Sequence, residues 1–199
     1  MLSLPKRIDE KIKINKDYSE EENYSVAPES LFELIKIIED RINKQGPGTE
    51  KNPIDLNDID VRKIENLHGV FNYINNKIVA VDVSDWDVSN AKALNSLFLG
   101  CKFLKYVGDL SGWNVENVND MHFMFSGCSR LRSIGNLSYW DVRNVTNFNS
   151  MFKGCEKLKD PNIDGWRVNS SLTKNDAKLI ISGTTGWKMP SWVKGLPVK

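Results

Sequence analysis

The 199-residue chain carries 27 Lys and Arg against 26 Asp and Glu, and 40% of its residues are hydrophobic. This composition is ordinary for a globular chain of one or two domains and sufficient for a sizeable core. The formal net charge of +1 argues against a dedicated binder of nucleic acid or of membrane surfaces, because both need a strong basic excess. No run of about 18 apolar residues predicts a membrane-spanning helix.

The first segment, residues 1–27, is polar and mixed in charge, and we expect an extended arm that becomes ordered on a partner. It lacks the apolar stretch and the small-residue cleavage site of a signal peptide. We therefore expect a cytoplasmic or virion-associated protein, with the cell surface as the alternative.

Residues 28–45 predict an amphipathic helix with five apolar side chains on one face. These are Leu31, Leu34, Ile35, Ile38 and Ile42. Pro28 suits the first helical position, and Ser30 with Glu33 could form a capping box instead. Gly46 and the proline after it break the helix. Residues 28–53 are thus predicted to be an N-terminal capping helix and linker.

A repeat of 27 residues dominates the middle of the chain. Cysteines, phenylalanines, glycines and tryptophans all recur at this step: Cys101, Cys128, Cys155; Phe98, Phe125, Phe152; Gly100, Gly127, Gly154; Trp86, Trp113, Trp140, with Trp166 one residue early. A degenerate unit from Ile59 to Ile74 fits the same frame. Such periodicity is typical of repeat proteins, and residues 54–170 are predicted to form about four to five coils.

Each coil contains two apolar patterns. Met121, Met124, Phe125 and Cys128 have helical spacing, and we expect a short helix there, ended by Gly127 in a left-handed conformation. Five aligned apolar residues predict short parallel strands on the other side: Leu56, Val83, Leu110, Leu137 and Ile163. The fold class is therefore predicted to be an α/β solenoid of leucine-rich-repeat type, with parallel strands on one side, short helices on the other and a capping helix at each end.

The last segment, residues 171–199, is predicted to cap the other end. A helix is expected from Thr173 through about Ser182, ended by Gly183. The aromatic tail at residues 187–193 is expected to cover the last coil.

The coil Trp-Asp-Val-Ser-Asn-x6-Leu-Phe-x-Gly-Cys at residues 86–101, with its sister at residues 140–155, resembles the BspA-like leucine-rich-repeat surface proteins. The closest branch is the lipoprotein-type repeat of mycoplasmas, gut bacteria and their phages. The resemblance covers about residues 55–168. It implies adhesion or protein recognition, and it brings no catalytic residues.

Two surface columns are candidate sites. If the apolar strand residues point inward, their neighbours point outward and form a polar strand face: Asp55/Asn57, Asp82/Ser84, Asp109/Ser111, Asn136/Ser138 and Asn162/Asp164. We predict protein binding there, and a plain solvated sheet is the alternative. A basic column, Lys105, Arg132 and Lys159, would hold an anionic partner or only counter-ions.

Other columns favour structural roles. The cysteines are expected to be buried thiols, because neighbouring coils separated by a helix width of roughly 10 Å would be too far apart for disulfides. The tryptophans form either a core spine or a sugar-stacking stripe. His68 and His122 have no nucleophile and acid arranged around them. We expect no enzyme, no metal and no cofactor.

These features predict a non-enzymatic scaffold that binds another protein, such as a phage virion or host-attachment component. The alternative is a bacterial surface adhesin that binds a carbohydrate or an anion through the tryptophan or basic column. Neither nucleic acid nor membrane insertion is expected.

Overall fold

The computed structural model describes residues 24–198, and little of this chain is regular secondary structure. It contains the helices α2 (Leu31–Gln45) and α3 (Ser191–Gly195), the strands β1 (Ile54–Asp55) and β2 (Val81–Asp82), and two 3-10 turns, η1 (Asn72–Ile74) and η2 (Leu110–Gly112). Residues 1–23 of the predicted N-terminal arm lie outside the described residues.

The predicted N-terminal helix is present as α2. Ser30 is its N-cap: the Glu33 N–H donates to the Ser30 Oγ at 3.2 Å. The Glu33 carboxylate accepts from the N–H of Glu29, one residue before the N-cap, at 2.9 Å, so the cap is a variant of the predicted capping box and Pro28 is not the first helical residue. Gly46, with φ of 81°, follows the last turn.

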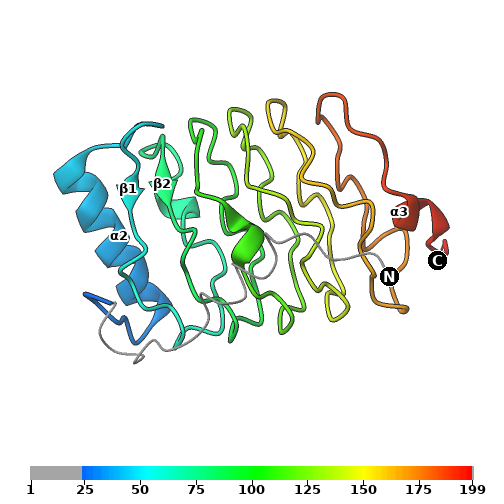
Figure 1. Cartoon of the computed structure of the whole chain (residues 1–199), viewed down its shortest axis with the longest axis horizontal. Helices are drawn as coiled ribbons and strands as arrows, with labels where there is room; N and C mark the ends of the chain where they lie inside the picture. The colour runs from blue at the N-terminus through cyan, green and yellow to red at the C-terminus, as the bar shows by residue number, and fades with distance from the viewer. Residues whose placement is uncertain (1–23, 199) are drawn as a thin grey trace, which may run out of the picture.

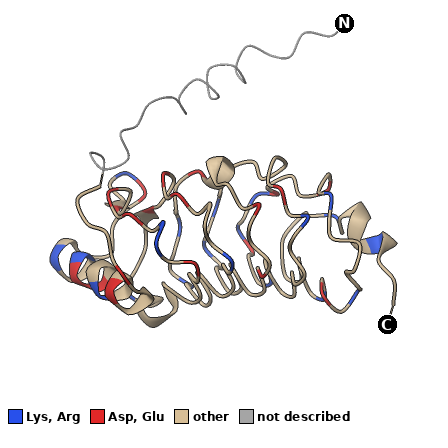
Figure 2. Ribbon diagram, turned by 90° about the horizontal axis from the view of Figure 1, so that it is seen from below, with Lys and Arg blue, Asp and Glu red and all other residues tan. Residues whose placement is uncertain are grey.

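Helix α2 closes the N-terminal end of the molecule (Figures 1 and 2). Its inner face buries Leu34, Ile38 and Ile42 completely or nearly so. Arg41 ties the helix to the first coil: its Nη2 donates to Asp58 Oδ2 at 2.8 Å, and its Nη1 contacts the other oxygen of the same carboxylate. A bidentate pair of this kind fixes orientation as well as charge.

Acid should weaken this tether first. The hydrogen bonds from Arg41 lower the pKa of Asp58 from 3.8 to about 2. A depressed pKa in the folded state gives stability that is complete above pH 4 and is lost as the pH falls toward 2. We expect Asp58→Asn to remove part of the fall in urea midpoint between pH 5 and pH 2. Asp55→Asn, which keeps its side-chain oxygen on the N–H of Asn57, is the control, and an unchanged acid slope in Asp58→Asn would contradict the assignment.

Repeat units of the chain lie side by side between α2 and α3 (Figure 1). Strands β1 and β2 pair in parallel, with Ile54 opposite Val81. A second series of parallel bridges joins residues 27 apart, at Asn66, Ala93, Asp120 and Asn147. The rings of Phe98, Phe125 and Phe152 stack at centroid distances of 5.5 and 5.6 Å and are fully buried. Equivalent residues therefore lie above one another, and their side chains form one continuous core.

The predicted helix in each coil is wrong. Residues 94–101 form two consecutive β-turns, closed by Leu97 N–H to Leu94 O and by Cys101 N–H to Phe98 O at 3.3 and 3.2 Å. Ser96 and Gly100 occupy the third positions with φ of 59° and 72°, the left-handed conformation that a type II turn requires there. An α-helix tolerates no such residue in its interior, so the apolar spacing i, i+3, i+4, i+7 here comes from turns.

Hydrogen bonds to the next coil hold these turns in place. The N–H groups of Leu94, Ser96, Phe98 and Gly100 donate to carbonyls of residues 120–126 at 2.8–3.0 Å. The same pattern recurs in the next two coils. We call residues 67–74, 94–101, 121–128, 148–155 and 177–184 the turn segments, and their stack the turn wall. All these N–H groups point toward the C-terminal neighbour, whereas the N–H groups of a β-strand alternate in direction.

The predicted strands are also largely absent from the opposite side. Within residues 24–198 only β1 and β2 are strands, and Leu110 begins the 3-10 turn η2. Isolated hydrogen bonds between adjacent coils replace a β-ladder here: the Leu110 N–H donates to Ile134 O at 2.9 Å, and the Leu137 N–H donates to Pro161 O at 2.8 Å. Val83, Leu110 and Leu137 are still fully buried, as their alignment predicts.

The predicted C-terminal capping helix is a fifth turn segment. Phe148, Ser150, Phe152 and Gly154 donate their N–H groups to carbonyls of residues 176–182 at 2.7–2.9 Å. Leu179 and Gly183 have φ of 59° and 79°, so they correspond to Ser150 and Gly154 with a step of 29 residues. The aromatic tail does pack on the last coils. The ring centroid of Trp187 lies 5.3 Å from that of Phe152, and the ring centroid of Trp192 lies 5.4 Å from that of Phe148.

Candidate functional site

The predicted polar strand face exists as a column of side chains that close local turns; we call it the front column. Asp82 Oδ1 accepts from the N–H of Ser84 at 3.0 Å, and Asp109 and Asn136 do the same for Ser111 and Ser138 at 2.9 and 3.0 Å. These are Asx turns, in which a short acceptor side chain satisfies a backbone N–H two residues on. Asp55 does the same for Asn57 at 3.0 Å. The structure thus brings eight of the ten predicted residues, from Asp55 to Ser138, together and gives them a local structural role.

Each Asx turn also contacts the next coil. A Cβ added at Gly108 would lie 2.5 Å from Asp82 Oδ1, and one at Gly135 would lie 1.9 Å from Asp109 Oδ1. Both glycines have φ near 90°. The repeated Gly-Asp/Asn pair at residues 108–109 and 135–136 is the signal in the sequence for this contact, and our sequence reading did not identify it.

The carboxylate of Asp164, at the C-terminal end of the predicted face, already has a partner within the chain. Its Oδ1 accepts from the Ser191 N–H at 2.5 Å, at the start of α3. This hydrogen bond lowers the pKa of the Asp164 carboxyl below its usual value. The front column that remains free for a partner therefore ends at Asn136 and Ser138.

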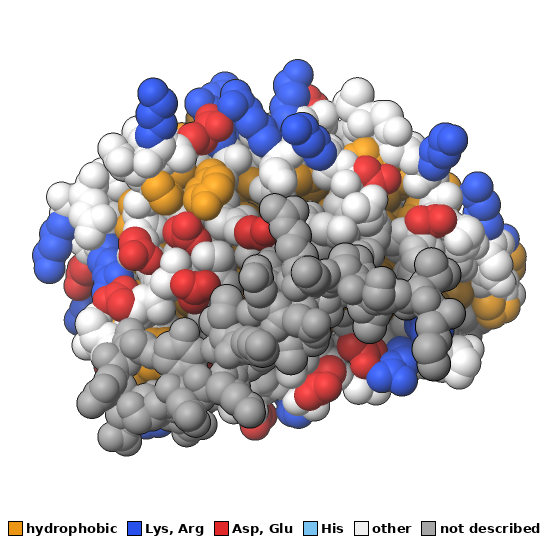
Figure 3. All heavy atoms as spheres, in the orientation of Figure 1, with side chains coloured by type: hydrophobic (Ala, Val, Ile, Leu, Met, Phe, Trp, Pro, Cys, Tyr) orange, Lys and Arg blue, Asp and Glu red, His pale blue; other side chains and the backbone are white. Residues whose placement is uncertain are grey.

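Acidic side chains gather over the β1–β2 half of the face seen in Figure 3, while Lys and Arg line one long edge. On the front column, Asp109, Asn136 and Ser138 are exposed, and the neighbouring Tyr139 is 79% exposed. Burial and the nearby Asp82 carboxylate raise the pKa of Tyr106, whose hydroxyl donates to Asp82 Oδ2 at 3.2 Å. The face therefore offers acceptor oxygens beside an exposed aromatic ring.

The basic column is partly neutralised within the chain. Glu50, in the linker after α2, lies 2.8 Å from Arg132 Nη1 and 3.8 Å from Lys105 Nζ. Lys159 makes no ion pair within the described residues, and its backbone N–H donates to Arg132 O at 3.0 Å. Beside the column, the Arg130 guanidinium lies 5.2 Å from the Phe103 ring centroid. A carboxylate thus already lies across two of the three predicted positions.

The tryptophan column is buried. Trp86, Trp113, Trp140 and Trp166 are 2–4% exposed, with centroids 6.4–6.5 Å apart. Each indole N–H donates to a carbonyl of the preceding coil, as Trp140 does to Leu110 O at 2.9 Å. The column is a core spine and offers no ring face for sugar stacking.

The cysteines are buried and free. Cys101 lies within hydrogen-bonding reach of Cys128, so hydrogen-bonded turns bring these two coils closer together than stacked helices would. Cys128 and Cys155 donate to the carbonyls of Phe98 and Phe125 at 3.1 Å. Burial raises the pKa of both thiols well above the usual value. The thiolate is the reactive form, so we expect no alkylation of the native protein by iodoacetamide at pH 8 and three alkylated cysteines in guanidinium. Rapid labelling of the folded protein, measured by mass spectrometry, would contradict this burial.

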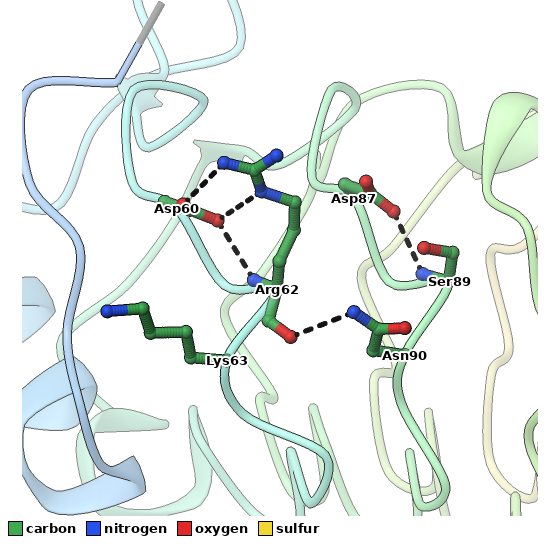
Figure 4. A pocket seen from close by; sticks show the side chains of 6 residues that line it. All are labelled: Asp60, Arg62, Lys63, Asp87, Ser89 and Asn90. Atoms are coloured by element: carbon green, nitrogen blue, oxygen red, sulfur yellow. Dashed lines mark hydrogen bonds and ion pairs between the residues drawn. The ribbon is translucent and has the colours of Figure 1, made fainter. Parts of the chain in front are cut away.

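A shallow hollow of about 420 Å³ lies between the first two coils (Figure 4). Its polar groups largely bond one another: Arg62 clamps Asp60, Asp87 accepts from the Ser89 N–H, and Asn90 donates to Arg62 O. The ammonium of Lys63 pairs with Glu29 at 2.5 Å. None of the predicted site residues lines this hollow.

The two histidines also have local partners. His122 Nδ1 lies 2.6 Å from Asp120 Oδ1, and His68 Nδ1 lies 2.6 Å from the amide nitrogen of Asn95. Both lie on the outer surface of the turn wall, with no cysteine or serine bonded to either ring among the described residues.

Together these features define a domain with little regular secondary structure, two parallel strands and a large buried aromatic core, which displays fixed polar columns. The family described as Mycoplasma protein of unknown function, DUF285, matches residues 43–166, more than half of the chain. The chain belongs to this family. No curated protein and no solved structure matches it. No helix within residues 24–198 is long and apolar enough to cross a bilayer.

Proposed function

We propose that this protein is a non-enzymatic scaffold that binds another protein through the front column. The observation that supports this most is the rigidity of the column: Asp82, Asp109 and Asn136 are each held by an Asx turn, at one position per coil. Small side chains on such a base leave a flat surface with little entropy to lose on binding. Tyr139, exposed beside Ser138, supplies the kind of aromatic anchor that dominates protein interfaces.

We also propose a more specific fold type and family relationship for this protein. Stacked coils with a 27-residue step support a solenoid of leucine-rich type, and the coil signature supports a relationship to the BspA-like surface proteins. That relationship favours recognition of a protein on a particle or a cell surface. A place in a phage virion or a host-attachment structure is our preferred setting.

The test uses substitutions that keep the turns. Asp109→Asn retains the side-chain oxygen that caps Ser111 but removes the charge, and Tyr139→Ala removes the exposed ring. We expect the double variant to bind the partner isolated by pull-down from the native host at least about tenfold more weakly, a loss of about 1.4 kcal/mol. Its melting temperature should stay within about 2 °C of the parent.

Asp141→Asn is the matched control, because Asp141 forms the same kind of turn with Arg143 at a different corner of the coil. It should bind normally. Equal affinity of the parent and the Asp109→Asn/Tyr139→Ala variant would reject the front column as the contact.

A second candidate function is anion binding at the basic column, favoured by Glu50 lying across Lys105 and Arg132. An external carboxylate or sulfate that displaced Glu50 would find the same two cations. Glu50→Gln should then strengthen the binding of a sulfated glycan severalfold, and Arg132→Glu should abolish it. Indifference of glycan binding to both changes would remove this candidate.

A further inference from the structure

The C-terminal edge of the turn wall differs from every other level of the stack. Each earlier turn segment donates alternate N–H groups to the segment that follows it. In the last one, residues 177–184, the corresponding donors are Ala177, Leu179, Ile181 and Gly183. Within the described residues these four N–H groups have no acceptor. We call them the donor row.

The donor row is accessible in part, since Ala177 and Ile181 are buried at 2% and 8% exposed. Leu179 is 42% exposed, and Lys178, Ser182 and Gly183 are exposed as well. Helix α3 and the aromatic tail pack on the core side of this end: the Trp192 ring centroid lies 6.2 Å from that of Trp166 and 5.4 Å from that of Phe148, and Trp187 lies 5.3 Å from Phe152. None of the described residues of this tail accepts a hydrogen bond from the donor row. At the other end of the molecule, α2 supplies a cap.

The common direction of the hydrogen bonds gives this edge a partial positive charge. Because all ladder N–H groups of the turn wall point the same way, their dipoles add along the stack, as they do along a helix. The C-terminal edge is the positive end. The charged side chains agree with this positive sign: the described residues after Asp176 include Lys178 and Lys188 but no Asp or Glu.

A row that contains only donors selects its partner. The edge of a β-strand alternates N–H and C=O groups, so an added strand would place N–H against N–H at every second position. Two copies meeting edge to edge would oppose donors at all four. Carboxylates present acceptors only, and charge-assisted bonds to backbone N–H groups are among the stronger hydrogen bonds.

We propose that the donor row, together with Lys178 and Lys188, is a docking site for an acidic segment of a partner protein. The site lies at the end of the stack and is independent of the front column. Either surface can therefore bind when the other has been altered.

The experiment follows backbone amides of the ¹⁵N-labelled full chain during titration with a ten-residue polyglutamate peptide. The amide signals of Ala177, Leu179, Ile181 and Gly183 should move downfield, and raising the salt should weaken the effect. Polylysine of equal length should leave them unmoved. Lys178→Glu/Lys188→Glu should weaken binding roughly tenfold, while Lys36→Glu, an exposed change on α2, should not.

Other outcomes would overturn the proposal. Slow hydrogen exchange of the four amides in the free protein would show that they are already paired. Shifts confined to the residues around Lys105 and Arg132, abolished by Lys105→Glu/Arg132→Glu, would place the acidic peptide on the basic column instead. Concentration-dependent filaments in sedimentation, with protection of the same amides, would make a second copy of this chain the occupant.

Discussion

Phe125→Ala should lower the free energy of unfolding by about 3–5 kcal/mol, the usual cost of removing a fully buried aromatic ring. The ring of Phe125 is stacked between Phe98 and Phe152, so its loss opens a cavity in the middle of the core. The total free energy of unfolding of a domain of this size is about 5–15 kcal/mol. Thermal unfolding followed by circular dichroism should show a drop of about 6–20 °C in melting temperature.

Tyr139→Ala is the control for that result, because Tyr139 is also aromatic but 79% exposed. It should change the melting temperature by less than about 2 °C. Similar losses for Phe125→Ala and Tyr139→Ala would mean that the phenylalanine column does not form the core.

Gly135→Ala should cost about 2–3 kcal/mol, although it adds only one methyl group. A left-handed φ of 87° penalises any side chain by about 1–2 kcal/mol. The new Cβ would also displace Asp109 Oδ1, which would lie 1.9 Å away, and break the bond to Ser111. That bond is worth about 1 kcal/mol. Chemical denaturation of purified variants measures the loss directly.

A double-mutant cycle separates the two causes. Asp109→Ala removes the carboxylate that Gly135→Ala would strike, so the double variant should be about 1 kcal/mol more stable than the sum of the single changes predicts. Gly112→Ala, in η2, meets nothing within 4 Å and has no left-handed φ, and it should be nearly neutral. Strict additivity of the cycle would show that Asp109 does not lie over Gly135.

The 27-residue step predicted which residues share a column, because a repeat can bury its apolar side chains only against its neighbours. Phe98, Trp113 and Cys128 are therefore buried where their alignment places them. The helix at residues 31–45 could be predicted from the sequence equally well, since Ser30 and Glu33 form a local cap that needs no tertiary contact.

The backbone conformation within each coil could not be predicted from the sequence in the same way. Met121, Met124, Phe125 and Cys128 have the spacing of a helical stripe, and two consecutive type II turns produce the same spacing. The deciding feature is the left-handed Phe123, with φ of 56°, and nothing about a phenylalanine signals that conformation. Hydrogen bonds to the next coil, such as Phe123 N–H to Asn149 O at 3.0 Å, stabilise it, and these exist only after stacking.

The candidate site was predicted in the same partial way. Alternation placed Asp82 and Asp109 on the surface, but their Asx turns and their contacts with Gly108 and Gly135 depend on how far the next coil is displaced. Glu50 reaches Arg132 from 82 residues away in the sequence, a pairing that no local pattern contains.

Nuclear Overhauser contacts test the stacking most directly. Stacked turns predict cross-peaks between the ring protons of Phe98 and Phe125 and between those of Phe125 and Phe152, whose centroids are 5.5 and 5.6 Å apart. They also predict no continuous series of helical contacts between residues three apart through residues 121–128. Helical contacts in that segment, without cross-peaks between rings 27 residues apart, would contradict the account.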